Sequence, residues 1–361
     1  MEITPFIPYK LLLHQDRLEA MGRGELVFPI SVELDLSNRC PHDCPFCSFG
    51  TSKSQGYRQQ NWVTFPYPRV LSLLQELKSC GVESVTFTGG GEPLIHPQAA
   101  EILGAASANG LQWGLVTNGL LLSGEVAHQV ARGATFVRVS LDAGTDATHM
   151  ITHGIQKPQL TQILHNINSL RGLSASVMIG ASFCVMDANY HEIETAAERL
   201  RIAGANYLEV RPTFPTDWRG DGWSNGLTPE HLDSALSTIA TLRAHYRDTG
   251  FKVIGMHERF DSALLKSAPK AYSKCRIGPL TTVIGADARL WHCCVQRGQP
   301  FFELGSVSTR PFHEVWETLW KISGDRSGKI DISKCPRCRY DGYNELLEHA
   351  VHADGLHRSF V

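Results

Sequence analysis

The chain has 361 residues, of which 42% are hydrophobic and 19% charged, which is the composition of an ordinary globular protein. Its net charge of −2 provides no field that would favour a nucleic-acid or a membrane partner, and we expect neither. The N-terminus carries Glu2 and Asp16 and no long apolar stretch. The sequence therefore predicts no signal peptide, no membrane span and a cytoplasmic location.

Much of the chain repeats one pattern, in which an amphipathic stretch ends at a glycine and a short apolar strand follows. A helical arm at 11–18 precedes the first predicted strand, at 31–36. Later strands are expected at 84–88, 114–117, 136–141, 176–184 and 207–211. The glycines before them are expected to be the left-handed residues that end helices, namely Gly81, Gly110, Gly133, Gly172 and Gly204. Strands that alternate with helices predict an α/β fold with a parallel sheet, here a partial (β/α)6 TIM-like barrel.

The repeat ends near residue 250, and cysteines become frequent again from Cys275 onward. The sequence therefore predicts an N-terminal arm at 1–29, a barrel at 30–250 and a small C-terminal domain at 251–361. The arm is much shorter than a separate peptide-binding domain would be, which favours a small polar molecule as the substrate.

The strands alternate between apolar and polar residues, and this alternation predicts what lines the barrel. Leu208 and Val210 must face the amphipathic helices, so Glu209 and Arg211 face the interior. By the same parity Cys184 points inward at the end of its strand. We expect these three polar residues to be catalytic, with Glu209 and Arg211 suited to hydroxyls or an amine and Cys184 to hydrogen donation. The alternatives are a purely structural buried ion pair and a cysteine that only fills space.

Eight of the ten cysteines fall in two groups, which in a reducing compartment indicates metal binding rather than disulfides. The first group is Cys40, Cys44 and Cys47, directly after the first strand. A [4Fe–4S] cluster is normally held by four cysteines, so three would leave one iron with an open coordination position. The alternative is a structural zinc site with His42 as the fourth ligand, but such sites favour C-x2-C spacing.

The C-x3-C-x2-C spacing, with Phe46 just before the last cysteine, resembles the signature of the radical S-adenosylmethionine (SAM) superfamily. Residues 88–93 (TGGGEP) resemble the glycine-rich motif of that superfamily, whose backbone binds the amino group of SAM. The resemblance implies reductive cleavage of SAM to methionine and a 5′-deoxyadenosyl radical that abstracts hydrogen from a substrate. It also implies a set of SAM-binding residues, namely Phe46, Gly89, Gly90, Gly91, Glu92, Asn118, Ser140 and Asp142.

The second group resembles the auxiliary-cluster domains called twitch and SPASM, although Ala288 stands where that pattern has glycine. The shorter twitch form fits better because no cysteine follows Cys338. The implied ligands of a second [4Fe–4S] cluster are Cys275, Cys293, Cys335 and Cys338. A cluster held by four cysteines passes electrons and binds no substrate. Cys294 could replace Cys293 as a ligand, and a four-cysteine zinc site is the alternative.

The cysteine layout resembles that of 2-deoxy-scyllo-inosamine dehydrogenase. This favours oxidation of a sugar, aminocyclitol or nucleoside, with the auxiliary cluster as electron acceptor and a flavodoxin- or ferredoxin-type reductant. Three alternatives remain open, because a fold alone does not give a function. The first is an epimerase or decarboxylase on a similar substrate, the second an enzyme that modifies a ribosomal peptide, and the third a non-catalytic iron–sulfur or zinc protein.

Overall fold

The computed structural model describes residues 8–47, 49, 62–213, 224–255, 260, 270–294, 297, 300–323, 330–335 and 339–351. Within these ranges no helix combines the length and the apolarity that a bilayer crossing requires.

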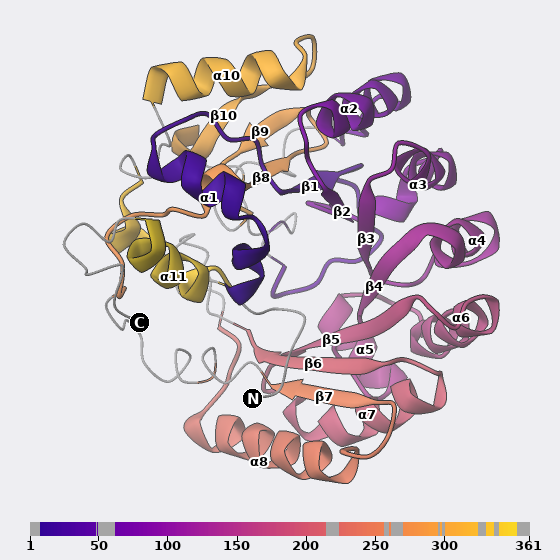
Figure 1. Cartoon of the computed structure of the whole chain (residues 1–361). Helices are drawn as coiled ribbons and strands as arrows, with labels where there is room; N and C mark the ends of the chain where they lie inside the picture. The colour runs from indigo at the N-terminus through magenta and orange to yellow at the C-terminus, as the bar shows by residue number, and fades with distance from the viewer. Residues whose placement is uncertain are drawn as a thin grey trace.

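The described strands form a curved ten-stranded sheet in the order β10-β9-β8-β1-β2-β3-β4-β5-β6-β7 (Figure 1). The neighbouring pairs from β1 to β7 are all parallel, and β8 pairs in parallel with the other edge of β1. β9 and β10 continue the sheet in antiparallel fashion. The bounds are β1 Ser31–Asp35, β2 Ser84–Thr88, β3 Gln112–Thr117, β4 Ala134–Ser140, β5 Met178–Val185, β6 Tyr207–Pro212, β7 Lys252–Gly255, β8 Thr281–Ile284, β9 Arg289–Trp291 and β10 Glu303–Ser306.

Helices cover the convex face of the sheet, whereas α1 and α11 lie on its concave side (Figure 1). The α-helices are α1 Gln15–Gly22, α2 Tyr67–Ser79, α3 Ala99–Ala108, α4 Gly124–Gly133, α5 Asp146–His153, α6 Leu160–Leu173, α7 Ile193–Ile202, α8 Pro229–His245, α10 Phe312–Ser323 and α11 Asp341–Val351. The short 3-10 helices are η1 Pro8–Leu13, η2 Pro93–Ile95, η3 Tyr190–Glu192, η5 Gly278–Leu280, η6 Pro300–Phe302 and η8 Ile332–Lys334. The predicted α/β fold with a parallel, barrel-like sheet is confirmed.

The core lies between the sheet and its outer helices, as the strand parity predicts. Val137, Val139 and Leu141 are fully buried in this core, together with Leu208 and Val210. The alternate side chains of β4 and β6 therefore face the barrel interior.

Two aromatic rings narrow the barrel interior at the start of the strands. A Cβ added at Gly114 would lie 2.1 Å from the Phe136 ring, and one at Gly180 would lie 2.0 Å from the Tyr207 ring. Each glycine is thus a small residue beneath an aromatic ring of the neighbouring strand. The two rings therefore form an apolar layer at the start of the strands, and the polar interior residues follow it along the strands.

The helix ends differ in part from the sequence-based expectation. Gly81, Gly110 and Gly204 have positive φ, as predicted, but Gly133 and Gly172 do not. Gly133 ends α4 directly before β4, and a Cβ there would lie 2.1 Å from Ser107 Oγ, so close packing rather than backbone conformation favours glycine. Gly172 is simply the penultimate residue of α6. The N-terminal arm is also divided, into η1 and α1 on either side of His14.

The C-terminal strands extend the barrel sheet, and the helix α10 contacts the barrel segments. β8 lies beside β1, and Trp316 of α10 donates a hydrogen bond of 2.8 Å to the Val27 carbonyl. The Glu76 carboxylate of α2 accepts from Phe312 N at 2.7 Å. β7 pairs with β6, so a strand of the barrel sheet lies just beyond the predicted boundary at residue 250. The three-part division itself stays a prediction.

We predict that Gly180→Ala lowers the free energy of unfolding by about 1–3 kcal/mol, because the new methyl group would overlap the buried ring of Tyr207. Gly172→Ala is the matched control, since a Cβ there meets no atom within 4 Å. It should leave stability unchanged or raise it by up to about 1 kcal/mol. Urea denaturation of both variants measures the difference, and equal stability of the two would contradict the overlap.

Candidate functional site

The loop that follows β1 carries Cys40, Cys44 and Cys47, all of them partly exposed. Its first part is held by Asn38, whose N donates to the Val63 carbonyl at 3.1 Å and whose Oδ1 accepts from Val63 N at 2.7 Å. These bonds fix the point at which the chain leaves the strand. The loop thus starts from a defined position at the carboxyl end of a parallel strand, where ligands bind in such folds.

Two backbone contacts from other elements hold the middle of this loop. Glu92 N donates to the Arg39 carbonyl at 2.7 Å, and Asp43 N donates to the His153 carbonyl at 3.0 Å. Each contact has a glycine beside it. A Cβ at Gly91 would lie 2.1 Å from the Arg39 carbonyl oxygen, and one at Gly154 would lie 2.2 Å from that of Asp43. Gly91 therefore has a packing role against the cysteine loop, whatever its part in SAM binding.

Glu92 joins the ends of β2 and β3 with its side chain. Its carboxylate accepts from Thr117 Oγ1 at 2.7 Å, Leu94 N at 3.0 Å and Asn118 N at 2.8 Å. Burial raises the pKa of this carboxyl, although the three hydrogen bonds oppose the shift. The neighbouring Asn118 accepts from Leu120 N through Oδ1, while its buried Nδ2 has no hydrogen-bond partner among the described residues. An unused buried donor at the ends of these strands is what a ligand with polar oxygens requires.

Asp142 has a φ of 52° and a side chain that is 1% exposed, so it faces its neighbours rather than the solvent. Its Oδ1 accepts from Cys184 N at 2.6 Å, and burial raises the pKa of the carboxyl to about 6. Ser140, two residues earlier, is partly exposed and pairs with Ser182 in the ladder between β4 and β5. The predicted SAM contacts thus lie at successive strand ends.

The three predicted catalytic residues form one network in the barrel interior. Glu209 lies between two arginines, with Oε2 at 3.3 Å from Arg138 and Oε1 at 3.1 Å from Arg211. The Nε of Arg211 lies 3.5 Å from the sulfur of Cys184. Burial raises the pKa of the Cys184 thiol to about 11, so the sulfur keeps its hydrogen at neutral pH. The inward parity predicted for these residues is confirmed, whereas their roles stay a prediction.

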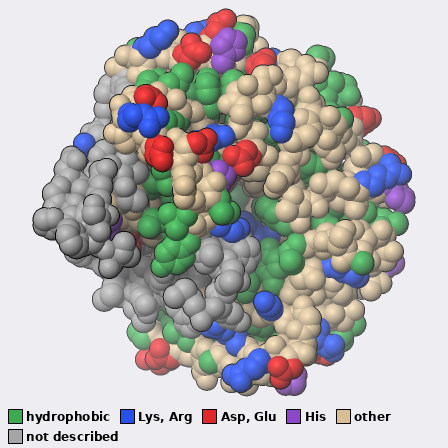
Figure 2. Space-filling model, viewed as in Figure 1, with side chains coloured by type: hydrophobic (Ala, Val, Ile, Leu, Met, Phe, Trp, Pro, Cys, Tyr) green, Lys and Arg blue, Asp and Glu red, His purple; other side chains and the backbone are tan. Residues whose placement is uncertain are grey.

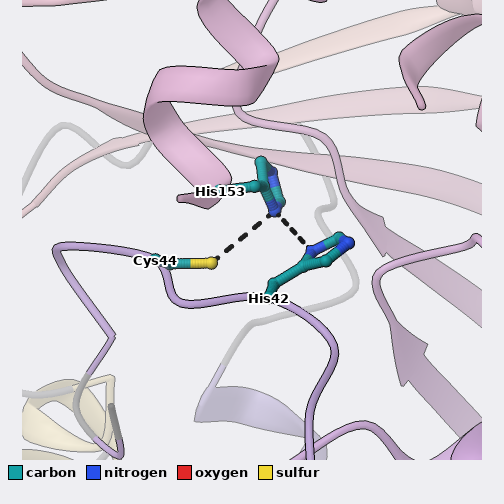
Figure 3. Close-up of side chains that lie close together, drawn as sticks. All are labelled: His42, Cys44 and His153. Atoms are coloured by element: carbon teal, nitrogen blue, oxygen red, sulfur yellow. Dashed lines mark hydrogen bonds between the residues drawn. The ribbon is translucent and has the colours of Figure 1, made fainter. Parts of the chain in front are cut away.

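Two histidines that the sequence did not mark as a pair meet beside the cysteine loop (Figure 3). The Nδ1 atoms of His42 and His153 lie 3.0 Å apart, and the sulfur of Cys44 lies 3.6 Å from His153 Nδ1. His42 Nε2 also lies 2.8 Å from Gln159 Oε1. The three ligand-type atoms of His42, Cys44 and His153 all lie within 4.8 Å of one another. The sequence places His42 with Cys44 as candidate zinc ligands, and the spacing of His149 and His153, four residues apart on α5, is the hint it gives of the third member.

The C-terminal cysteines line one cavity with Tyr272, His292 and Tyr340; the cysteines are Cys275, Cys293, Cys294 and Cys335. Burial, together with the neighbouring thiols of Cys293 and Cys335, raises the pKa of Cys275 to about 12. Several thiols are therefore buried close together in one cavity, and binding to a metal cluster would compensate the cost of ionising them. Cys338 lies outside the described residues.

A buried arginine connects this C-terminal region to the barrel. Arg297 donates to the Asp35 carboxylate at 2.5 Å, and lies 3.4 Å from Glu33 on the same strand. Its guanidinium also stacks over the Phe49 ring, 4.9 Å from the centroid. Arg339 forms a second ion pair with Glu33. The space-filling view, taken from the same side as Figure 1, shows Lys and Arg side chains near the middle of the visible face (Figure 2).

Residues 34–205 match the family profile of the radical SAM superfamily. These residues form a radical SAM domain. The match confirms the predicted superfamily, whose members are enzymes that bind SAM and an iron–sulfur cluster. The cysteine loop, the glycine-rich turn and the ends of β3 and β4 all lie inside the matched range.

The curated relatives of this chain include a PqqA peptide cyclase from Streptomyces rochei, 27% identical over 184 residues that cover 50% of this chain and 49% of that protein. The sporulation killing factor maturation protein SkfB of Bacillus subtilis is 28% identical over 213 residues, which cover 57% and 48%. An AdoMet-dependent heme synthase from Methanosarcina barkeri is 25% identical over 284 residues, which cover 74% and 77%. The chain thus spans about half the length of the first two proteins.

Solved structures show the same fold. The crystal structure of Streptococcus suis SuiB bound to the precursor peptide SuiA has a TM-score of 0.66 and 16% identity, and the match covers 95% of this chain and 77% of that one. The likeness therefore extends from the radical SAM barrel into the C-terminal strands.

We predict that Gly91→Ala lowers the iron content of the reconstituted protein, because a methyl group there would push the cysteine loop away from the end of β2. Iron should fall by at least a third relative to the wild type, while circular dichroism stays unchanged. Gly250→Ala is the control, since a Cβ at that position meets nothing within 4 Å. A Gly91→Ala protein with full iron would show that the loop tolerates the displacement.

Proposed function

We propose that this chain is a radical SAM enzyme that modifies a peptide. In this proposal Cys40, Cys44 and Cys47 hold a [4Fe–4S] cluster, and SAM binds at the adjoining strand ends. When bound, the cluster supplies one electron for cleavage of SAM to methionine and a 5′-deoxyadenosyl radical, which takes a hydrogen atom from the substrate. The reductant would be a flavodoxin- or ferredoxin-type protein.

The single observation that carries the proposal is the cysteine loop, fixed by backbone hydrogen bonds to the loop after β2 and to the last residue of α5. Three partly exposed thiols on such a loop suit a cluster that must keep one iron open. The orphaned Nδ2 of Asn118 supports a SAM site beside it, on the same side of the barrel as the motif at Gly89, Gly90 and Glu92. Phe46, Ser140 and Asp142 complete the proposed SAM-binding set.

A second cluster is proposed in the C-terminal cavity, held by Cys275, Cys293, Cys335 and Cys338. The support is that the described members of this set line one cavity, where burial and the neighbouring Cys293 thiol raise the pKa of both Cys275 and Cys335. Its function would be electron transfer, because a fully ligated cluster has no position left for a substrate. Cys294 lines the same cavity and is the proposed alternative to Cys293 as a ligand.

The comparisons favour a peptide over the small polar molecule expected from the sequence. PqqA peptide cyclase is named for a peptide, and SuiB was crystallised with a precursor peptide. The small-substrate expectation rested on the short N-terminal arm, which is a weak argument because a peptide needs no separate domain to reach the open side of a barrel. Oxidation of a sugar, aminocyclitol or nucleoside is therefore the alternative.

Within the barrel, Glu209, Arg211 and Cys184 are the proposed substrate-facing residues. Arg211 would bind a carbonyl or carboxylate oxygen of the substrate, and Glu209 would hold Arg211 in place. Cys184 retains its hydrogen at neutral pH and would supply it in an epimerisation. In an oxidation the electron would leave to the second cluster, and this thiol would be dispensable.

We predict that anaerobic reconstitution gives about eight irons per chain, as two [4Fe–4S] clusters require. Replacing Cys40, Cys44 and Cys47 together by Ala should leave about four irons and abolish 5′-deoxyadenosine formation under dithionite. Replacing Cys275 and Cys335 should also leave about four, with SAM cleavage retained. A wild type with four irons and one zinc would disprove the second cluster.

We predict that the abstracted hydrogen comes from a peptide. The holoenzyme would be incubated with SAM, dithionite and short peptides from source cells grown on deuterated amino acids. Mass spectrometry should then find deuterium in 5′-deoxyadenosine. The matched control uses a deuterated pool of sugars, aminocyclitols and nucleosides with unlabelled peptides. Deuterium that arises only from the control pool would replace the peptide proposal with the small-molecule alternative.

A further inference from the structure

Cys44 has a polar neighbour that comes from a distant part of the chain. The Nδ1 atom of His153, at the end of α5, lies 3.6 Å from the Cys44 sulfur, within hydrogen-bonding distance for this larger atom (Figure 3). The loop and the helix also meet through Asp43 N and the His153 carbonyl at 3.0 Å. The side-chain contact is therefore supported by a backbone contact of the same two segments.

The ring of His153 has almost no freedom to turn. It is 1% exposed, and its Nε2 lies 3.2 Å from the Leu141 carbonyl and 3.5 Å from Asp142 Oδ2. On one side it stacks on the ring of His149, with centroids 4.1 Å apart and an angle of 22°. On another it meets the His42 ring edge-on at 4.9 Å. Packing rather than a chance rotamer therefore sets the direction of Nδ1, which faces both the Cys44 sulfur at 3.6 Å and the Nδ1 of His42 at 3.0 Å and can share its hydrogen between them.

The burial of His149, the stacking partner, lowers the free energy of unfolding. Its side chain is fully buried, and neither ring nitrogen has a hydrogen-bond partner among the described residues. A buried polar group without a partner destabilises a protein, and phenylalanine would fill the same space without that cost. Among the described residues its ring stacks on His153 and makes an edge contact with His42. The ring of His149 thus packs against His153, the histidine that contacts Cys44, and limits its rotation.

We propose that His153 donates a hydrogen bond from Nδ1 to the Cys44 sulfur when that sulfur binds iron, and thereby raises the reduction potential of the cluster. His153 is then a positioning and tuning residue, not a ligand. The inference rests on the proposed function, since it concerns the cluster at Cys40, Cys44 and Cys47. Nothing in the superfamily signature places a histidine at this point.

The direction of the effect follows from charge. A thiolate bound to iron has no hydrogen and can only accept, so the hydrogen in this contact must sit on Nδ1. Reduction adds negative charge to the cluster and its sulfur ligands, and a donor stabilises the reduced state more than the oxidised one. With the hydrogen on Nδ1, Nε2 becomes an acceptor and no longer donates to the Leu141 carbonyl, which lies 3.2 Å away. Asp142 Oδ2, which has no hydrogen-bond partner among the described residues, can share a proton with it across 3.5 Å.

The test compares His153→Phe with His149→Phe in the reconstituted holoenzyme. Both variants keep an aromatic ring in the stack, but only the first removes the nitrogen that faces Cys44. The readout is a potentiometric titration followed by EPR, on the signal that changes when SAM is added. We expect His153→Phe to lower the equilibrium constant for reduction about tenfold, which is about 59 mV for one electron. His149→Phe should leave the potential unchanged.

Two results would overturn the inference while leaving the proposed function intact. One is a His153→Phe protein with full iron and the potential of the wild type. The other comes from wild-type protein labelled with 15N-histidine, which needs no variant to fold. Pulsed EPR of the reduced cluster should show a weak 15N coupling, so its absence, or a coupling as strong as that of an iron ligand, contradicts a hydrogen bond. A wild type that holds no iron at this loop overturns the proposed function and the inference together.

Discussion

The geometry of the whole site depends on one steric constraint, the close passage of the cysteine loop over two glycines. The loop crosses Gly91 at the end of β2 and Gly154 at the end of α5, and a methyl group at either place would overlap a backbone carbonyl of the loop. Main chain held against main chain cannot relax by a side-chain rotation. The position of Cys44 is therefore set by the sheet and by α5, and any strain in either element is transmitted to the three thiols.

The element α5 is itself held at both ends. At its start, the Glu192 carboxylate accepts from Gly144 N, Thr145 N and the hydroxyls of Thr145 and Thr148. At its end, Gly154 takes the left-handed conformation with φ of 60°. The helix is eight residues long, so a displacement at one end would move the other. This explains why histidines on such a short helix can hold a fixed relation to a loop more than a hundred residues earlier.

Local sequence patterns predicted the strands, the helices and the residues that face the barrel interior. They did not predict the contacts between residues that are distant in the sequence. Alternation along β4 and β6 predicted that Val137 and Leu208 face the core and Glu209 the interior, because a period of two leaves no other arrangement. The rule that a glycine after an amphipathic stretch is a left-handed helix end failed for Gly133, because close packing against Ser107 comes from another helix and has no local sequence signal. Likewise, Cys44 was predicted from its spacing, but its contact with His153 joins segments that no periodicity relates.

The charges in the barrel interior are arranged in a way that limits how a substrate can be recognised. Glu209 contacts both Arg138 and Arg211, and Asp35 contacts Arg297 from the C-terminal region. Buried charges of this kind cost free energy unless they stay paired, and these are paired with one another before any substrate arrives. In the proposed site, a substrate carboxylate at Arg211 would therefore compete with Glu209 at short range. Because the guanidinium has five donors, Arg211 can bind both at once, and recognition then adds a partner instead of breaking an ion pair.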